Sequence, residues 1–435
     1  MTDGHSTACA NDGASPQGTL DGVVPDRETA ERLDADDELA WARAEFVRPD
    51  GLVYLDGNSL GALGRGVPGR VADVVTRQWG EHLIRAWNDD GWWSAPERIG
   101  DRIGRLLGAA PGQTVVGEST SVQIFNALAA AARLRPGRSV LLTDPEHFPT
   151  DRYLAASVGR LLGLEVVERP VHQLAPTLRE RGGDVAVVAY AAVDYRTGER
   201  WDVPALTAGA HAAGAVVVWD LCHAVGAMPL RLDADGVDLA VGCTYKFLSG
   251  GPGAPAFGYV AARHQAAYDP PLTGWHGHAR PFAMAPRFEP APGIARARVG
   301  TPPVLSLLAL DAALDVFDKV DLGRLRDKSL SLGRFFLSCV DGLLDGLGFT
   351  VVTPREPARR GSQVTLRHPD AYPMMAALVE RGVIGDVRPP DLLRFGFNPL
   401  YVSYVDLHTA VRELRDVAVS GRYRDPRFQV RQAVT

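Results

Sequence analysis

An aspartate, a histidine and a lysine follow two short aliphatic runs, where they could act together on a ligand. Asp220 and His223 follow the run AVVVW, and Lys246 follows DLAVGC by three residues. If both runs are parallel strands, their carboxyl ends meet at one sheet edge, where open α/β sheets bind ligands. Lys246 is one of only three lysines among 46 basic residues, so chemistry that needs a lysine amine has few candidates.

A lysine amine beside a carboxylate is what pyridoxal phosphate requires. The cofactor forms a Schiff base with the amine, and a carboxylate lies against its pyridine nitrogen. A charged Asp220 would keep that nitrogen protonated, because opposite charges stabilise each other's ionised form. Partial desolvation would help Lys246 to release its proton. These residues therefore predict a pyridoxal phosphate site.

The same residue types also have purely structural interpretations. Asp220 could cap a helix, and His223 could be a structural histidine with its hydrogen bonds satisfied. Residues 119–121 (Ser-Thr-Ser) begin a predicted helix. Such side chains at a helix N-terminus can cap the helix or bind a phosphate, and the sequence does not separate the two roles. Lys319 and Lys328 lie among aspartates on a helical stretch, which favours a solvated charged face.

The elements that would position these residues alternate between helical segments and short Val-, Leu- and Ala-rich runs. The runs lack polar alternation, as is typical of parallel strands buried on both faces. Alternating strands and helices imply a parallel sheet with helices on both sides. The predicted strands are 139–142, 184–189, 215–219 and 238–241, and the helices between them include 120–134 and 203–213.

Changes in amino-acid composition along the chain suggest where its domains begin and end. We expect a disordered leader at 1–25, an N-terminal segment at 26–65 that packs with the small domain, a large domain at 66–310 and a small C-terminal α+β domain at 311–435. The N-terminal segment begins with a helical pattern over 27–46. Residues 268–301 are rich in Pro, Gly, His and aromatics, which predicts a long irregular segment.

Composition excludes several classes of protein. A net charge of −6 argues against a dedicated nucleic-acid binder. The four cysteines stand far apart without a CxxC pair, which argues against a zinc site or a disulfide framework and favours a reducing cytoplasm. No uncharged apolar run approaches the roughly 18 residues that a membrane span needs.

Beyond these patterns, the chain closely resembles the kynureninase family, fold-type-I pyridoxal phosphate enzymes of the aspartate aminotransferase superfamily. The resemblance runs from about Tyr54 to Tyr401 and rests on the order and spacing of long motifs. The motifs are YLDGNSLG (54–61), LIRAWNDDGWW (83–93), FPTD (148–151), WDLCHAVGAMP (219–229), GCTYKFLSGGPG (242–253), GWHGHARPFAM (274–284), GIARARVGTPP (293–303) and RGVIGDVRPPDLLRFGFNPLY (381–401).

The resemblance implies roles for the residues around the cofactor. Lys246 would bind it and later act as base at the substrate α-carbon. Asp220 would pair with the pyridine nitrogen, with His223 close by, and Tyr245 would reach the phosphate and take part in proton transfer. The remaining implied cofactor contacts are Thr120 and Ser121 on the phosphate, Phe148 stacked on the ring, and Thr150 and Asp151 within FPTD.

Further implied roles concern the substrate and a second subunit. Trp275 and Thr301 match positions that contact the cofactor from a neighbouring subunit, which implies a homodimer with active sites at its interface. Arg394 matches the arginine that binds the substrate α-carboxylate, a bidentate role suited to its planar fork. Trp87, His82 and His276 lie in motifs expected to line the pocket for the aryl group. No metal is expected.

The implied fold has a large domain with a mostly parallel seven-stranded sheet flanked by helices, and a smaller C-terminal α+β domain. The implied activity is hydrolysis of the Cβ–Cγ bond of L-kynurenine, or of a 3-hydroxy or methylated kynurenine, to an anthranilate and L-alanine. Alternatives are another reaction on this fold, such as desulfuration or transamination, or a non-catalytic family member. Desulfuration normally needs a cysteine on a mobile loop, whereas Cys222 and Cys243 follow buried strands.

One position inside the predicted site departs from the family pattern. Family members usually carry Ser or Thr where this chain has Ala191. A hydroxyl near the cofactor is therefore missing, which bears on cofactor tuning or substrate choice and leaves the Lys246–Asp220 pair intact.

Overall fold

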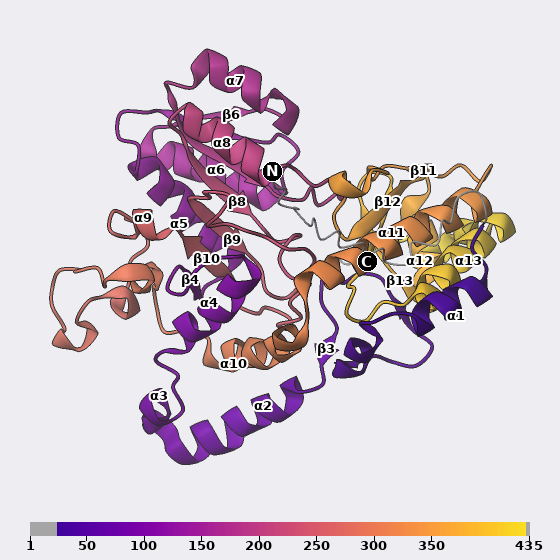
Figure 1. Ribbon diagram of the computed structural model, residues 1–435, viewed down its shortest axis with the longest axis horizontal. Helices are drawn as coiled ribbons and strands as arrows, with labels where there is room; N and C mark the ends of the chain where they lie inside the picture. Colours follow the sequence, from indigo (N-terminus) through magenta and orange to yellow (C-terminus); the bar gives the residue numbers. More distant parts are fainter. Residues whose placement is uncertain (1–23, 432–435) are drawn as a thin grey trace, which may run out of the picture.

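A seven-stranded sheet forms the centre of the larger part of the molecule (Figure 1). The computed structural model describes residues 24–431, so most of the expected leader lies outside the described residues. The strand order is β4-β10-β9-β8-β7-β5-β6, and β10 runs antiparallel to both of its neighbours. The strands are β4 (Thr114–Val116), β5 (Val140–Thr143), β6 (Glu165–Glu168), β7 (Val185–Ala191), β8 (Val216–Asp220), β9 (Leu239–Gly242) and β10 (Phe257–Val260). The expected mostly parallel sheet is confirmed.

Helix α5 (Thr120–Arg133) places its N-terminus, which can bind an anion, at the edge of the large sheet. Its Ala-rich sequence is buried on nearly every side, as expected of a helix enclosed in a core. Ser119 caps it, because the Ser119 side chain accepts a hydrogen bond from the Val122 backbone N–H. Strand β4 leads directly into α5, so the helix N-terminus lies at the same edge as the carboxyl ends of β8 and β9.

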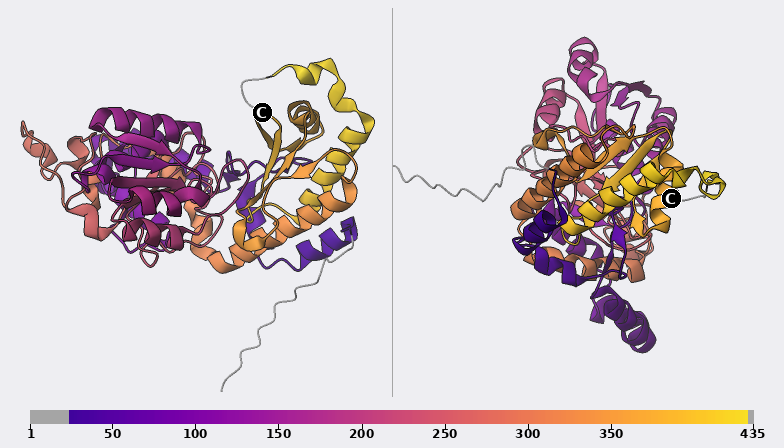
Figure 2. Two further views of the ribbon diagram at one scale, coloured as in Figure 1. Left: turned by 90° about the horizontal axis from the view of Figure 1, so that it is seen from above. Right: turned by 90° about the vertical axis from the view of Figure 1, so that its right-hand side faces the viewer.

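The other helices of this part surround the sheet or project from it. They are α2 (Val67–Asp73), α3 (Ala86–Asp89), α4 (Ala95–Leu106), α6 (Pro149–Leu162), α7 (Leu174–Arg181), α8 (Val203–Ala212), α9 (Ala262–Gln265) and α10 (Val304–Ala313). Helix α2 continues as a π-helical segment, Val74–His82, and forms an arm below the sheet in Figure 1. The 268–301 segment is irregular apart from short 3-10 helices, as predicted, and it projects at one end of the molecule (Figure 2).

The C-terminal part contains a second, antiparallel sheet with strand order β11-β12-β15-β14. Its strands are β11 (Thr350–Val351), β12 (Gln363–Arg367), β14 (Asp386–Arg388) and β15 (Leu392–Gly396), and its helices are α11 (Leu322–Leu343), α12 (Ala371–Glu380) and α13 (Tyr404–Ser420). Phe336 of α11 contacts the rings of Phe395 and Phe397, so α11 covers one face of this sheet. The two sheets lie at opposite ends of the long axis (Figure 2).

The N-terminal residues pack beside this second sheet. The predicted 27–46 helix is divided into α1 (Arg27–Ala35) and a 3-10 helix, Ala40–Glu45. Asp34 accepts the backbone N–H groups of Tyr404 and Val405 at the start of α13. Strand β2 (Val53–Tyr54) pairs in parallel with β13 (Val383–Ile384), and β1 (Phe46–Val47) pairs with β3 (Leu63–Gly64).

The prediction that Lys328 belongs to a solvated charged face is wrong. Its side chain is buried on α11, and its Nζ lies 2.6 Å from an Asp37 carboxylate oxygen. Burial lowers the pKa of Lys328, and the Asp37 charge opposes that shift. Lys319 is exposed, as expected. The charge pattern of α11 was misleading because the N-terminal segment, distant in sequence, covers the face that carries Lys328.

Candidate active site

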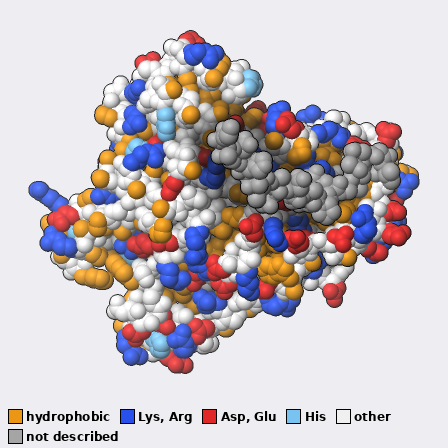
Figure 3. Space-filling view, viewed as in Figure 1, with side chains coloured by type: hydrophobic (Ala, Val, Ile, Leu, Met, Phe, Trp, Pro, Cys, Tyr) orange, Lys and Arg blue, Asp and Glu red, His pale blue; other side chains and the backbone are white. Residues whose placement is uncertain are grey.

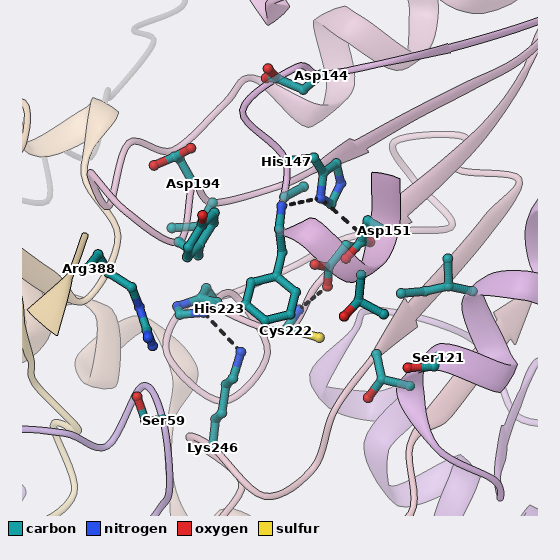
Figure 4. Close-up of a pocket in the computed structure, with 18 of the residues that line it drawn as sticks. Ser59, Ser121, Asp144, His147, Asp151, Asp194, Cys222, His223, Lys246 and Arg388 are labelled. Atoms are coloured by element: carbon teal, nitrogen blue, oxygen red, sulfur yellow. Dashed lines mark hydrogen bonds and ion pairs between the residues drawn. The ribbon is translucent and has the colours of Figure 1, made fainter. Parts of the chain in front are cut away.

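A cavity of about 310 Å³ opens at the carboxyl edge of the large sheet, between that sheet and the C-terminal part (Figure 4). Its walls come from the ends of β7, β8 and β9, from the N-termini of α5 and α6, and from β14 and β15. The predicted site residues that line it are Thr120, Ser121, Phe148, Thr150, Asp151, Asp220, His223, Tyr245, Lys246 and Arg394.

Lys246 points into the cavity and meets His223. The distance between Lys246 Nζ and His223 Nε2 is 3.0 Å (Figure 4). Burial and then the Lys246 charge lower the pKa of His223 well below its usual value, so its imidazole is neutral and accepts from the lysine. The other ring nitrogen, Nδ1, is buried without a partner among the described residues.

Asp220 ends β8 beside a second carboxyl group. One Asp220 oxygen accepts the Cys222 backbone N–H at 2.7 Å, which holds the carboxylate in the turn after the strand. Burial and then the nearby Asp220 raise the pKa of Asp151 well above its usual range, so Asp151 retains its proton. His147 Nδ1 accepts the Phe148 backbone N–H at 2.9 Å and lies 3.6 Å from an Asp151 oxygen.

The cluster of His147, Asp151 and Asp220 could bind either a cationic ring nitrogen or a metal ion. The ligand atoms of His147, Asp151 and Asp220 all lie within 4.8 Å of one another. A protonated Asp151 is neutral, and metal ligands must be deprotonated, which favours a ring nitrogen over a metal ion at this position.

The N-terminus of α5 also lines the cavity. Thr120 Oγ1 is buried and has no hydrogen-bond partner among the residues that the structure describes. Free N–H groups and the positive end of the helix dipole favour an anion at this position. Tyr245 also lines the cavity, and burial raises the pKa of its hydroxyl, which therefore stays neutral and can donate. These groups together fit a phosphate.

An aromatic ring and a buried arginine complete the cavity. Phe148 lies at the start of α6, and its ring meets Tyr195 edge to face at 5.2 Å. Arg394 is fully buried on β15, where it pairs in register with Asp386 of β14. Its Nε donates to Asp386 at 2.8 Å, and its Nη1 donates to the Tyr195 carbonyl at 2.7 Å.

Five predicted site residues do not line this cavity as formed by residues 24–431 of one chain. Trp275 and Thr301 are exposed on the projecting irregular segment. Trp87 and His276 belong to an aromatic cluster near the arm, and His82 binds Asp90 at 2.7 Å. Burial and then Arg298 lower the pKa of His276 to about 4, so its ring is neutral. Their predicted roles stay predictions.

Several cavity residues had no predicted role. Ser59, His147, Tyr195 and Arg388 all line it. Ser59 and Arg388 lie within motifs that carry the family resemblance, and His147 directly precedes FPTD, so motif membership was the available signal. Ala191 also lines the cavity and pairs in register with Asp220, which places the missing hydroxyl beside the predicted pyridine position.

Comparison with known sequences decides the family. A family model described as the kynureninase C-terminal domain matches residues 325–414. A kynureninase from Deinococcus radiodurans is 53% identical over 385 residues, which cover 87% of this chain and 93% of that protein. The chain belongs to the kynureninase family. The family resemblance predicted from the motifs is thereby confirmed, and a kynureninase from Burkholderia pseudomallei is 45% identical over 94% of this chain and 99% of its own length.

Solved structures agree on the fold of this kynureninase-family chain. A cysteine desulfurase from Thermococcus onnurineus NA1 superposes with a TM-score of 0.74 at 16% identity, covering 88% of this chain and 98% of that one. The cysteine desulfurase CsdA from Escherichia coli gives a TM-score of 0.73 at 21% identity, with the same coverage. At such identities the likeness concerns the fold alone, and the predicted fold type I is confirmed.

Proposed function

We propose that the chain hydrolyses the Cβ–Cγ bond of L-kynurenine, or of a ring-substituted kynurenine such as the 3-hydroxy compound, to an anthranilate and L-alanine. The observation that carries the proposal is the convergence of Lys246, Asp220 and Arg394 on one cavity in a kynureninase-family chain. These residues offer an amine, a carboxylate and a carboxylate-binding cation, the set that an amino-acid substrate and pyridoxal phosphate need.

The groups around the cavity fit pyridoxal phosphate. Thr120 Oγ1, partnerless in the described structure, and the α5 N-terminus would hold the phosphate. Asp220 would hold the pyridine nitrogen, Phe148 would stack on the ring, and Lys246 would carry the aldehyde carbon. When bound, the cofactor supplies an electron sink next to the substrate α-carbon.

The residues of the chain then move protons and orient the substrate. The Lys246 amine removes the α-proton, and its neighbour His223, being neutral, adds no competing positive charge. Asp220 keeps the pyridine nitrogen protonated through its negative charge. Tyr245, with its proton retained by burial, can donate a hydrogen bond to an oxygen bound in the cavity. Arg394, by binding the substrate α-carboxylate, would hold the reacting atoms of the substrate close to Lys246 and Tyr245.

We also infer a homodimer that works in the cytoplasm, within tryptophan breakdown through kynurenine. Exposed apolar side chains on the arm and on the projecting segment support an interface, and they include Trp79, Ile84, Trp275, Phe282 and Met284. Hydrophobic side chains gather on that projecting segment in Figure 3. The thiols of Cys222, Cys243 and Cys339 are free, which supports a reducing compartment. In the described part of the chain, no helix is long and apolar enough to cross a membrane.

The test is direct assay of the purified holoenzyme with L-kynurenine and with 3-hydroxykynurenine. We expect L-alanine and the matching anthranilate in equal amounts. Absence of both products from these substrates and from ring-methylated kynurenine would refute the proposal. Desulfuration is not favoured, since the described cysteines are buried.

A further inference from the structure

The turn that carries Lys246, residues 244–250, contains a strained backbone position. The turn closes through a hydrogen bond from the Gly250 N–H to the Thr244 carbonyl, at 2.9 Å. Ser249 has a φ of 55°, a value that residues other than glycine rarely adopt. Such a conformation persists only where the surrounding structure holds it. The contacts around this turn therefore bear directly on where the Lys246 amine lies.

The carbonyls of both residues that flank Lys246 are bound by segments distant in sequence. The Gly61 N–H, in the N-terminal segment, donates to the Tyr245 carbonyl at 2.7 Å. Asn398 Nδ2, shortly after β15, donates to the Phe247 carbonyl at 3.2 Å. The backbone is thus fixed immediately before and immediately after the lysine.

Gly61 packs so closely against this turn that a side chain has no room. A Cβ on Gly61 would lie 2.7 Å from Ser249 Cα and closer still to the Lys246 carbonyl oxygen. Both are backbone atoms, and non-bonded carbon atoms pack at about 3.5 Å or more, so the turn would have to move by roughly 1 Å. Figure 4 shows the segment that carries Ser59, two residues before Gly61, beside the base of Lys246. The glycine is therefore required for this close approach.

Asn398 is fully buried, and both ends of its amide are occupied. Besides the bond from Nδ2 to Phe247, its Oδ1 accepts the Leu400 N–H at 3.0 Å. The two supporting segments are also joined to each other, because the Gly396 N–H donates to the Leu55 carbonyl at 2.6 Å. The N-terminal segment and the C-terminal sheet therefore form one support for the turn.

We propose that Gly61 and Asn398 are positioning residues of the active site, which hold the turn so that the Lys246 amine meets the aldehyde carbon of pyridoxal phosphate. The inference deepens the proposed function and rests on its assignment of Lys246. Neither residue lines the cavity formed by residues 24–431, so each acts through the backbone beside the lysine. Lys246 Nζ lies 3.0 Å from His223 Nε2, and a shift of about 1 Å would break this hydrogen bond.

The experiment compares pyridoxal phosphate with deoxypyridoxine phosphate, which has the same ring and phosphate but no aldehyde to bond with Lys246. Dissociation constants come from fluorescence titration of the full chain freed of cofactor, as wild type, Gly61→Ala and Asn398→Asp. The aspartate keeps the shape of Asn398 and the bond from Leu400 but turns an oxygen toward the Phe247 carbonyl. The preference for the aldehyde isolates the bond to Lys246, and a general loosening of the site would weaken both ligands alike.

Two matched controls separate positioning from ordinary packing. Gly209→Ala adds the same methyl group at an exposed glycine of α8, where no described atom lies within 4 Å of the new Cβ. Asn126→Asp makes the same exchange at a buried asparagine of α5, whose Nδ2 donates to the Leu272 carbonyl at 3.4 Å. Both changes therefore fall outside the turn of Lys246. Circular dichroism establishes that each variant is folded.

We expect Gly61→Ala and Asn398→Asp each to reduce the preference for pyridoxal phosphate by about 10- to 100-fold, since misplacing a reacting group by about 1 Å costs up to about 100-fold. Both controls should keep the wild-type preference. An unchanged preference in either folded variant, or an equal loss for both ligands, would overturn the inference. If Gly61→Ala does not fold, Asn398→Asp decides. If the wild type makes no anthranilate but the preference still falls in the variants, the positioning role stands and the proposed reaction is refuted.

Discussion

Replacing Asp56 with asparagine should change how the stability of the protein depends on pH. Burial and then Asp386 raise the pKa of the Asp56 carboxyl from the usual 3.8 to about 7. Between these values the folded protein keeps a proton that the unfolded chain releases. The free energy of unfolding of the wild type therefore falls as the pH rises through this window. Asparagine has nearly the same shape and cannot ionise, so the variant escapes this loss.

The size of the effect follows from the two pKa values. Each pKa unit is worth about 1.4 kcal/mol, so the wild type loses about 2 kcal/mol by pH 5 and about 4 kcal/mol by pH 8. The stability advantage of Asp56→Asn should therefore grow by about 2 to 3 kcal/mol between these pH values. Below about pH 3 both chains carry a neutral group at this position in either state, and the advantage disappears.

Urea denaturation of the wild type and Asp56→Asn, followed by circular dichroism from pH 4 to pH 8, measures this difference. Subtraction removes the contributions of the titrating groups that do not interact with Asp56. Asp50→Asn is the matched control, because Asp50 is exposed near the same N-terminal segment and its variant should follow the wild-type curve. A constant difference between Asp56→Asn and the wild type over the whole range would refute the reasoning.

Three further changes test the site and the fold. Lys246→Ala should lower turnover by at least about 1,000-fold and abolish the borohydride-sensitive visible absorbance of the holoenzyme; normal turnover would refute its assignment. Asp220→Asn should lower kcat by about 100-fold or more with a smaller change in KM, as steady-state kinetics would show, and an unchanged kcat would contradict a charged partner for the ring nitrogen. Lys328→Met should reduce the free energy of unfolding by about 3 to 5 kcal/mol by leaving Asp37 buried and unpaired, whereas the exposed Lys319→Met should change it by less than about 1 kcal/mol. Equal small losses in both lysine variants, measured by urea denaturation, would show that the Lys328 pair is not buried in solution.

The positions of Asp220 and Lys246 were predictable because they depend on local signals. Strands buried on both faces are read from unbroken aliphatic runs, and the observed β5, β7, β8 and β9 each lie within two residues of the prediction. In a parallel sheet, the residues that follow such strands necessarily meet at one edge. The Lys246–Asp220 side of the cavity needed no knowledge of contacts between distant segments.

Other features depend on segments that only the folded chain brings together. The charges around Lys328 resemble a solvated helix face until the residues near Asp37, almost 300 positions away, cover it. Two partners of Arg394 are likewise invisible in its motif, because Ser59 and Tyr195 approach it from distant parts of the chain. The sequence by itself therefore determined the strands and the placement of Lys246 and Asp220 at one sheet edge, since hydrophobic periodicity is local. The tertiary structure alone decided which charges are buried and which distant groups occupy the donors of Arg394, since burial and hydrogen bonding between remote segments arise from long-range packing.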